Sequence, residues 1–380
     1  MAFKTVVASA LSLESPEALF RDIRTKKIPG LLSQQADLLR EYTTKAVDKP
    51  DVALQLPTGS GKTLVGLLIG EWRRRKFRQR VVYLCPTNQL AHQVVTLAVS
   101  KYGLKVNGFV GKKSDYDANA KSEYVAAEAV AVTSYSSLFN TAPFFHDPDI
   151  IVLDDAHSGE NYIPKLWSLR ISRTDHQPVY EAALAVFLDK MSWADRQRLQ
   201  ASSSTPWEHN WVEKIPTPVF YERVQELIGV LDTQIAPNSD LIYQWRLIRD
   251  RLLAYHFFLD MREILIRPLI PPTFSHAPFA RATQRVYMSA TLGQGGDLER
   301  ITGRSGILRL QVAGWEKQGI GRRFFVFPQR SLREAEADEL TAKAISAGGR
   351  ALAGLYKLVW PKREESPVSI GWNGLPQCMS

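Results

Sequence analysis

A glycine-rich loop between a predicted strand and a predicted helix limits the possible folds of this chain more than any other feature. The loop reads Leu-Pro-Thr-Gly-Ser-Gly-Lys-Thr over residues 56–63. It follows the apolar run Val52–Leu56 and leads into Thr63–Arg75, where the apolar residues have helical spacing. Glycines let the backbone N–H groups of such a loop turn toward phosphates at the start of a helix. The segment therefore predicts a phosphate-binding site in an α/β domain.

The residue types in this loop also indicate how a nucleoside triphosphate and Mg²⁺ are held. Lys62 is expected to reach the β- and γ-phosphates, and Thr63 to hold Mg²⁺ through its hydroxyl. A glycine-rich turn without a ligand is the alternative, and the strand–loop–helix context disfavours it. The residues expected to surround the nucleotide are Pro57, Thr58, Gly59, Ser60, Gly61, Lys62 and Thr63.

Further apolar runs predict the rest of a sheet. They lie at Val81–Cys85, Val130–Val132 and Ile150–Leu153, and segments with helical patterns separate them. Strands that are apolar throughout and separated by helices indicate a parallel sheet covered on both faces. The predicted fold class is α/β.

Two carboxylates follow the last of these runs, in the segment Ile151–His157. Ligands of open α/β sheets bind at the carboxyl ends of the strands, where Asp154 and Asp155 are expected to lie. Asp154 is predicted to orient Mg²⁺, and Asp155 to position or deprotonate an attacking water. Together with Lys62 they form the predicted catalytic set. An acidic strand end without a catalytic role is the alternative, which the upstream loop disfavours.

The sequence changes character after Gly159. Helices are predicted at Tyr180–Met191, Tyr221–Leu231 and Leu241–Ile266, and a strand at Gln284–Met288. A further strand and helix are predicted at Phe324–Phe327 and Leu332–Ala347. The predicted division is a nucleotide-binding domain over 1–159 plus 281–320, a helical insertion over 160–280, and the start of a second α/β domain with an irregular tail over 321–380.

With these motifs in this order, the chain resembles a DEAD/DEAH-type superfamily 2 helicase, which implies a RecA-like P-loop NTPase fold. Gln35 matches the family's adenine-reading Q motif, although Gln34 is an alternative. The matching motifs imply two further sets of residues. Nucleic-acid contacts are implied for Pro86, Thr87, Gln89 and Thr133. Coupling of the ATP state to strand movement is implied for His157, Ser289, Ala290 and Thr291.

The spacing of the motifs resembles one branch of that superfamily. Roughly 130 residues separate the acidic segment from Ser-Ala-Thr, far more than an ordinary loop holds. This arrangement is similar to the XPD/DinG-like branch, which has a helical arch domain at this point. That branch usually carries an iron–sulfur domain as well. This chain has only two cysteines, Cys85 and Cys378, so no four-cysteine cluster is expected.

Two departures from the family affect the expected rate of hydrolysis. The family has Glu where Asp155 stands, and a shorter side chain places the carboxylate further from the water. The family's site also lies between two RecA-like domains, and the second supplies arginine fingers. This chain is expected to lack most of that second domain, and another chain could supply it.

Bulk properties fit the same interpretation. The formal net charge of +9 favours a polyanionic partner, DNA or RNA, with DNA favoured. No membrane span is expected, and the few cysteines fit a reducing, cytoplasmic location. The resulting prediction is the ATP-binding lobe of a nucleic-acid helicase or translocase. The alternatives are a non-motor ATP- and nucleic-acid-binding fragment or subunit that hydrolyses little ATP, and a small-molecule P-loop kinase or NTPase.

Overall fold

The computed structural model describes residues 12–57, 59–200, 211–292 and 296–311, together with positions 333, 335, 336, 339 and 340. The chain divides into two compact units, Met1–Gln318 and Gly319–Ser380. The architecture below is that of the first unit. The predicted elements at Phe324–Phe327 and Leu332–Ala347 lie almost entirely outside the described residues, as does Thr58.

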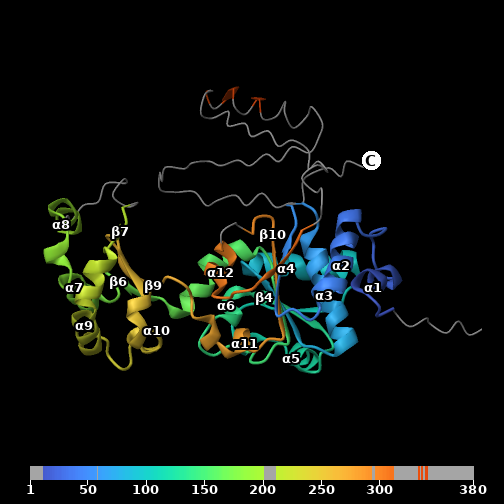
Figure 1. Ribbon diagram of the computed structural model, residues 1–380, viewed down its shortest axis with the longest axis horizontal. Coiled ribbons are helices and arrows are strands. Elements are labelled where there is room, and N and C mark those ends of the chain that lie inside the picture. Colours follow the sequence, from blue (N-terminus) through green and yellow to red (C-terminus); the bar gives the residue numbers. More distant parts are fainter. Residues whose placement is uncertain are drawn as a thin grey trace, which may run out of the picture. The chain divides into compact units, whose positions relative to one another are not determined.

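A seven-stranded sheet forms the centre of the first unit (Figure 1). Every pair of neighbouring strands in it is parallel, and the order is β11-β1-β10-β5-β2-β4-β3. The α/β class and the parallel sheet predicted from the sequence are therefore confirmed. The strands are β1 (Asp51–Gln55), β2 (Val81–Cys85), β3 (Val106–Phe109), β4 (Val130–Ser134), β5 (Ile150–Leu153), β10 (Gln284–Ser289) and β11 (Leu308–Gln311).

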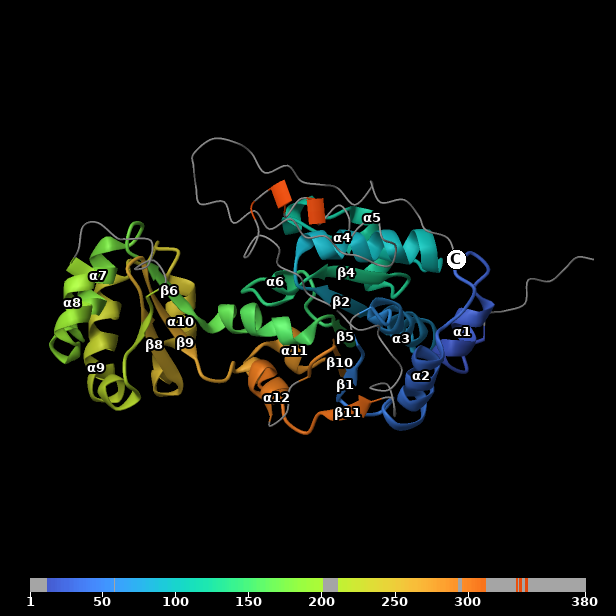
Figure 2. The ribbon, with the colours of Figure 1, turned by 90° about the horizontal axis from the view of Figure 1, so that it is seen from above.

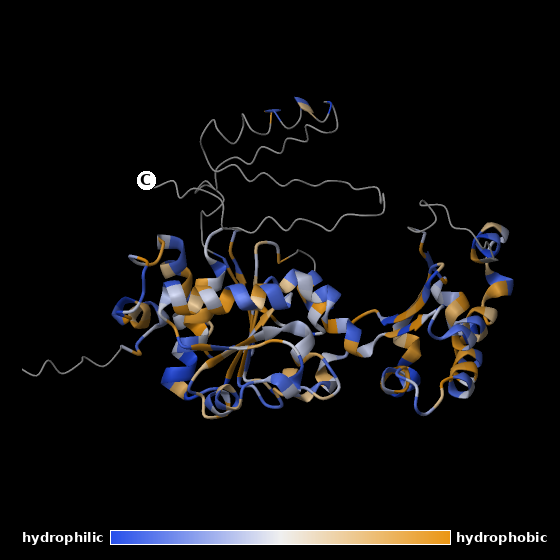
Figure 3. Ribbon diagram, turned by 180° about the vertical axis from the view of Figure 1, so that it is seen from behind, coloured by the Kyte–Doolittle hydropathy of each residue, from blue (hydrophilic) through white to orange (hydrophobic). Residues whose placement is uncertain are grey.

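Helices cover both faces of this sheet, so the strands are buried on both sides (Figure 2). Successive residues of β1 pack on opposite faces: Val52 and Leu54 join one apolar cluster, and Ala53 joins the other. One face is covered by α1 (Pro16–Asp22), α2 (Ser33–Lys45), α3 (Lys62–Phe77) and α4 (Asn88–Leu97). The other cluster includes residues of α5 (Ala118–Val125), α6 (Tyr135–Leu138), α11 (Ala277–Ala280) and α12 (Asp297–Thr302). Colouring by hydropathy shows the apolar strands between more polar helices (Figure 3).

The segment between β5 and β10 forms a smaller assembly of helices and an antiparallel sheet. Its four strands have the order β6-β9-β8-β7. They are β6 (Leu169–Ser172), β7 (Glu213–Lys214), β8 (Tyr255–Leu259) and β9 (Glu263–Pro268). The helices are α7 (Gln177–Ala185), α8 (Trp193–Gln200), α9 (Thr217–Gln234) and α10 (Ile242–Ile248). The insertion is therefore helical as predicted, but it also contains a sheet that the sequence analysis did not predict.

The helix predicted over Leu241–Ile266 is wrong in its second half. Helical structure ends at Ala254, and two strands follow, joined by a tight turn at Asp260. The Asp260 carboxylate accepts hydrogen bonds from the backbone N–H groups of Arg262 and Glu263, at 2.6 and 2.7 Å. Aspartate commonly stabilises turns in this way. The buried residues of β8 and β9 alternate with partly exposed ones, and this two-residue period is typical of a half-buried strand.

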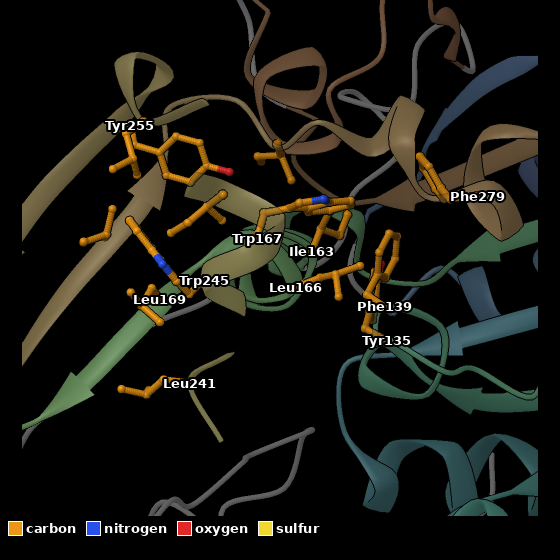
Figure 4. Close-up of a cluster of buried hydrophobic side chains, with 14 of the residues drawn as sticks. Tyr135, Phe139, Ile163, Leu166, Trp167, Leu169, Leu241, Trp245, Tyr255 and Phe279 are labelled. Carbon is orange, nitrogen blue, oxygen red and sulfur yellow. The ribbon is translucent and has the colours of Figure 1, made fainter. Parts of the chain in front are cut away.

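Short helical turns connect the main elements. They are Ala98–Tyr102, Lys113–Asp115, Ala156–Asn161, Ile163–Trp167, Leu188–Lys190, Arg249–Ala254 and Thr273–Ser275. The turn Ile163–Trp167 leads from the large sheet into the insertion, and its side chains join an apolar cluster with members in both parts (Figure 4). In the described part of the chain, no helix is long and apolar enough to cross a membrane.

Candidate active site

The order of the strands brings together motifs that are far apart in the sequence. β10 lies between β1 and β5, although it is the last of these three strands in the chain. Because the strands are parallel, the segments that follow β1, β10 and β5 leave the same edge of the sheet. The glycine-rich loop, Ser289 and Asp154 are therefore neighbours, and the backbone N–H of Leu56 donates to the Ser289 carbonyl at 3.0 Å.

The loop itself has the backbone conformation that its glycines predict. Gly59 and Gly61 have φ values of 84° and 77°, a region that side chains disfavour. Gly61 caps the sixteen-residue helix α3 at its N-terminus, where free N–H groups attract anions. Ser60 is buried, and its hydroxyl donates to the Pro57 carbonyl at 2.6 Å. The residues present therefore fit a phosphate group at this helix end.

The side chain of Gln35 is hydrogen-bonded to the glycine-rich loop. Its side-chain amide donates to the Ser60 carbonyl at 2.7 Å and accepts from the Leu32 N–H at 2.9 Å. A methyl group on Gly61 would overlap the Gln35 amide nitrogen. Between the two glutamines that the sequence left open, Gln35 is the buried one in contact with the loop. Its adenine-reading role stays a prediction.

Lys62 and Asp155 form an ion pair, with 2.7 Å between the ammonium nitrogen and a carboxylate oxygen. Their side chains are 13% and 37% exposed, so the pair lies at the surface of the site. Asp155 has a left-handed backbone with φ of 47°, one of only three described non-glycine residues with a positive φ. Such strain is found most often at functional sites.

Asp154 lies behind this pair, at the end of β5. Tyr83 donates its hydroxyl to the Asp154 carboxylate at 2.8 Å, and the Asp155 N–H donates at 3.0 Å. Burial, with a smaller contribution from the neighbouring Asp155 charge, raises the pKa of Asp154 to about 6. The side chain of Thr63 lies near enough to the Tyr83 hydroxyl to lower its pKa, although burial, the largest effect, raises that pKa well above its usual value. Thr63 and Asp154, the two residues predicted to hold Mg²⁺, therefore both lie beside one tyrosine.

Two tyrosines in contact with Asp154 were missed by the sequence analysis. Tyr83 is in the middle of β2, and Tyr135 donates its hydroxyl to the Asp154 backbone carbonyl at 2.9 Å. Both side chains are fully buried. Both tyrosines are in or next to apolar strands. In such a position, the sequence pattern of a site residue is the same as that of an ordinary core residue. Only the strand order β5-β2-β4 reveals their contact with Asp154.

The Ser-Ala-Thr segment contacts the acidic segment, and the coupling role implied for both stays a prediction. The His157 ring nitrogen Nδ1 and the Ser289 hydroxyl oxygen are 2.8 Å apart. The Ser289 hydroxyl also accepts from the Thr291 N–H at 3.2 Å. The Ala290 carbonyl accepts from the Gln55 side chain at 3.4 Å, next to the glycine-rich loop.

A groove of about 550 Å³ lies along the carboxyl ends of β2 and β4. Pro86 and Thr87 line it, and Thr87 also caps helix α4 by accepting from the Leu90 N–H at 3.2 Å. The residues with polar side-chain groups in its lining are Thr87, Asn88, Lys113, Tyr116, Ser134, Ser136, Ser137, Asn140 and Tyr162. Gln89 is exposed on α4 but is not part of the lining.

The implied contact between Thr133 and a nucleic acid needs correction. Thr133 is fully buried, and its hydroxyl donates to the Phe109 carbonyl at 2.5 Å. This side chain therefore holds β3 against β4 and does not reach the groove. The next residue, Ser134, lines the groove instead.

Among the described residues, no group of three or more His, Cys, Asp or Glu side chains could hold a metal ion. The chemistry expected here needs no such group. Mg²⁺ in nucleotide sites is bound by one or two protein oxygens together with phosphates and water. The assignment of Thr63 and Asp154 to that role stays a prediction.

The parallel sheet, with the glycine-rich loop at the carboxyl end of β1 and the carboxylates at the end of β5, defines a P-loop NTPase fold. Residues 34–186 match the model of the DEAD/DEAH box helicase family. This match agrees with the family resemblance that the motifs predicted. The comparison with curated proteins found no match.

The chain is also similar to solved structures of XPD proteins, at low identity. Xpd4 of S. tokodaii is 15% identical with a TM-score of 0.43, covering 74% of this chain and 61% of Xpd4. An apo XPD structure is 21% identical with a TM-score of 0.40, covering 70% of this chain and 56% of that one. An XPD helicase is 16% identical with a TM-score of 0.42, covering 77% and 64%. The chain thus spans less than two thirds of each of these proteins.

Proposed function

We propose that the chain is the ATP-hydrolysing lobe of a nucleic-acid helicase or translocase. The observation that carries this proposal is the convergence of Lys62, Asp154 and Asp155 at one edge of the sheet, with the Lys62–Asp155 pair 2.7 Å apart. The groove lined by Thr87 lies further along the same edge, beyond β5. The motifs at Pro86–Gln93 and Ser289–Thr291 argue against a small-molecule kinase.

The residues of the site have distinct tasks in ATP hydrolysis. The N–H groups of residues 59–63 and the Lys62 ammonium bind the phosphates, and Thr63 and Asp154 would hold Mg²⁺. Bound Mg²⁺ supplies positive charge that offsets the charge on the phosphate oxygens. Asp155 orients a water for attack on the γ-phosphorus and accepts its proton. The bond from the γ-phosphorus to the bridging oxygen breaks, giving ADP and phosphate.

The groove supports binding of a nucleic-acid backbone. Hydroxyl and amide side chains, backbone N–H groups and one lysine are the groups that contact phosphates and sugars in nucleic-acid complexes. The net charge of +9 favours the same partner. Pro86, Thr87 and Ser134 are proposed to lie closest to the strand, which is DNA in preference to RNA.

The 2.8 Å contact between His157 and Ser289 is proposed to link hydrolysis to movement of that strand. His157 follows the catalytic carboxylates, and Ser289 follows β10, which borders the glycine-rich loop. A movement of the bound phosphates can therefore affect Ser289 through His157 and also through the glycine-rich loop. The proposed division is domain 1 over residues 1–159 plus 281–320 and an insertion over 160–280, similar to the XPD/DinG-like branch.

A second candidate is an ATP- and nucleic-acid-binding protein with little turnover. The ion pair favours it, because the Asp155 carboxylate neutralises the Lys62 ammonium that would bind phosphate. The side chain of Asp155 is also one methylene shorter than the family's Glu. Catalytic geometry does not tolerate errors of about 1 Å.

Phosphate release by the purified chain, measured with and without single-stranded DNA and RNA, separates these functions. A rate that rises with nucleic acid supports the motor lobe. Tight ATP binding without turnover under all conditions supports the second candidate. Turnover that depends on a small metabolite and ignores nucleic acid rejects both.

A further inference from the structure

The peptide that joins the two catalytic carboxylates is held by a buried hydroxyl. Tyr135, at the start of α6, donates to the Asp154 carbonyl at 2.9 Å. That carbonyl and the Asp155 N–H belong to the same peptide plane, and the N–H donates to the Asp154 carboxylate at 3.0 Å. Both ends of this plane are therefore fixed by hydrogen bonds.

The orientation of this plane determines where the Asp155 side chain points. Asp155 has φ of 47° and ψ of 55°, a left-handed conformation that costs about 1 kcal/mol or more for a residue with a side chain. The hydrogen bond from Tyr135 helps to hold this strained backbone. Without it, the peptide could rotate toward a relaxed conformation and carry the Asp155 carboxylate away from Lys62.

The ring of Tyr135 also contacts a residue that lines the groove. It stacks on Tyr162, with ring centroids 5.6 Å apart and planes inclined by 20°. Tyr162 lines the groove together with Thr87 and Ser134, and the Lys165 ammonium lies 5.1 Å from its ring centroid. Two aromatic rings thus span the distance from the groove wall to the catalytic peptide. Figure 4 shows Tyr135 next to Phe139 in the apolar cluster.

We propose that Tyr162 and Tyr135 are positioning residues through which a single strand of nucleic acid in the groove stimulates ATP hydrolysis. A base or sugar that packs against Tyr162 presses its ring onto Tyr135. The Tyr135 hydroxyl then holds the Asp154–Asp155 peptide in the conformation in which Asp155 can orient water. The proposal rests on the proposed function, since it names the route by which one site of that function regulates the other.

The test compares ATP hydrolysis by the full chain with and without saturating oligo-dT. Tyr135→Phe removes only the hydroxyl, and Tyr162→Leu removes the aromatic ring but keeps an apolar side chain. Each is expected to lower the stimulation, the ratio of kcat with DNA to kcat without it, about fivefold to tenfold, the worth of one hydrogen bond. The KM for ATP is expected to stay unchanged, and Tyr162→Phe should restore the stimulation.

Tyr180→Phe is the matched control. Tyr180 is also buried, and its hydroxyl donates to an aspartate carbonyl, that of Asp260, at 3.1 Å within the insertion. Its loss should leave the stimulation unchanged. Wild-type stimulation in both Tyr135→Phe and Tyr162→Leu, or an equal loss in Tyr180→Phe, would overturn the inference while leaving the proposed function intact. A wild-type chain with no turnover at all overturns both.

Discussion

The Lys62 ammonium is bonded to the Asp155 carboxylate at 2.7 Å, so the cation expected at the phosphates already has an anionic partner. Phosphate oxygens must compete with Asp155 for this cation. The same carboxylate must then be free to orient water. Binding of ATP and activation of Asp155 are therefore linked steps, and each depends on breaking one ion pair.

Asp155→Asn is expected to separate these two steps. Removal of the charge frees Lys62, so the Kd for Mg-ATP should fall by up to about fivefold, the worth of a partly exposed ion pair. The same change removes the group that accepts the proton, so kcat should fall by about 10²-fold to 10⁴-fold. Calorimetric titration with ATP and phosphate release at saturating ATP measure the two effects.

Glu160→Gln is the control for that variant. Glu160 lies on the same short helical turn as His157 and pairs with Arg300 at 3.0 Å, away from the glycine-rich loop. It should leave both the affinity and kcat unchanged. Unaltered turnover in Asp155→Asn would remove Asp155 from the catalytic set.

The raised pKa of Asp154 predicts a particular pH dependence of stability. Burial raises this pKa from 3.8 to about 6, so the folded chain holds the proton more tightly than the unfolded chain does. Ionisation of Asp154 therefore costs stability, and its contribution to the free energy of unfolding falls as pH rises from about 4 to about 6. Above that range the cost is constant.

Asp154→Asn removes this cost because the amide does not ionise. The gain in the free energy of unfolding over wild type should grow between pH 4 and pH 6 and then level off. Urea unfolding at pH 4.5, 6 and 8 measures it. A gain that is the same at all three pH values would show that Asp154 does not titrate in this range.

The sequence predicted those parts of the site that depend on local spacing. Gly59 to Thr63 and Asp154 could be found because glycine, lysine and paired aspartates each have a chemical role at a strand end. Tyr83, Tyr135 and the supporting role of Gln35 could not, since their function comes from strand order and from contacts across the sheet. The predicted contact by Thr133 was wrong for the same reason: neighbouring strand residues alternate in direction, and only Ser134 reaches the groove.

A buried ion pair is expected to hold the neighbouring strands β1 and β10 together near their N-terminal ends. Asp51 bonds to Arg285 at 2.7 Å, and both side chains are at most 2% exposed. Burial alone would raise the pKa of Asp51, but hydrogen bonds from Arg304 and Arg285 outweigh it and lower the pKa below 3.8. This contribution to stability is present above pH 3.8 and is lost as pH falls through the lower, folded value.

Asp51→Asn should therefore destabilise the chain by about 3–5 kcal/mol, because it leaves the Arg285 charge buried without a counterion. Asp37→Asn is the matched control, since Asp37 pairs with Arg40 at the surface and should change stability by less than about 1 kcal/mol. Urea unfolding at pH 7 compares them. Equal effects of the two substitutions would contradict a structural role for the buried pair.

The last prediction concerns the contact between Gln35 and Gly61. Gly59→Ala and Gly61→Ala impose the same backbone strain, since both glycines have φ near 80°. Only at Gly61 would the added methyl group also overlap the Gln35 amide, whereas nothing lies within 4 Å of it at Gly59. Gly61→Ala should therefore lower the melting temperature and the affinity for ATP more than Gly59→Ala does.

A double variant identifies the cause of this difference. Gln35→Ala removes the amide that the methyl group would meet, so Gly61→Ala should cost less in the Gln35→Ala background than in the wild type. A coupling free energy of about 1 kcal/mol is expected for two residues in direct contact. Additive effects of the two substitutions would show that backbone strain alone decides the outcome. They would also show that Gln35 does not determine the shape of the phosphate loop.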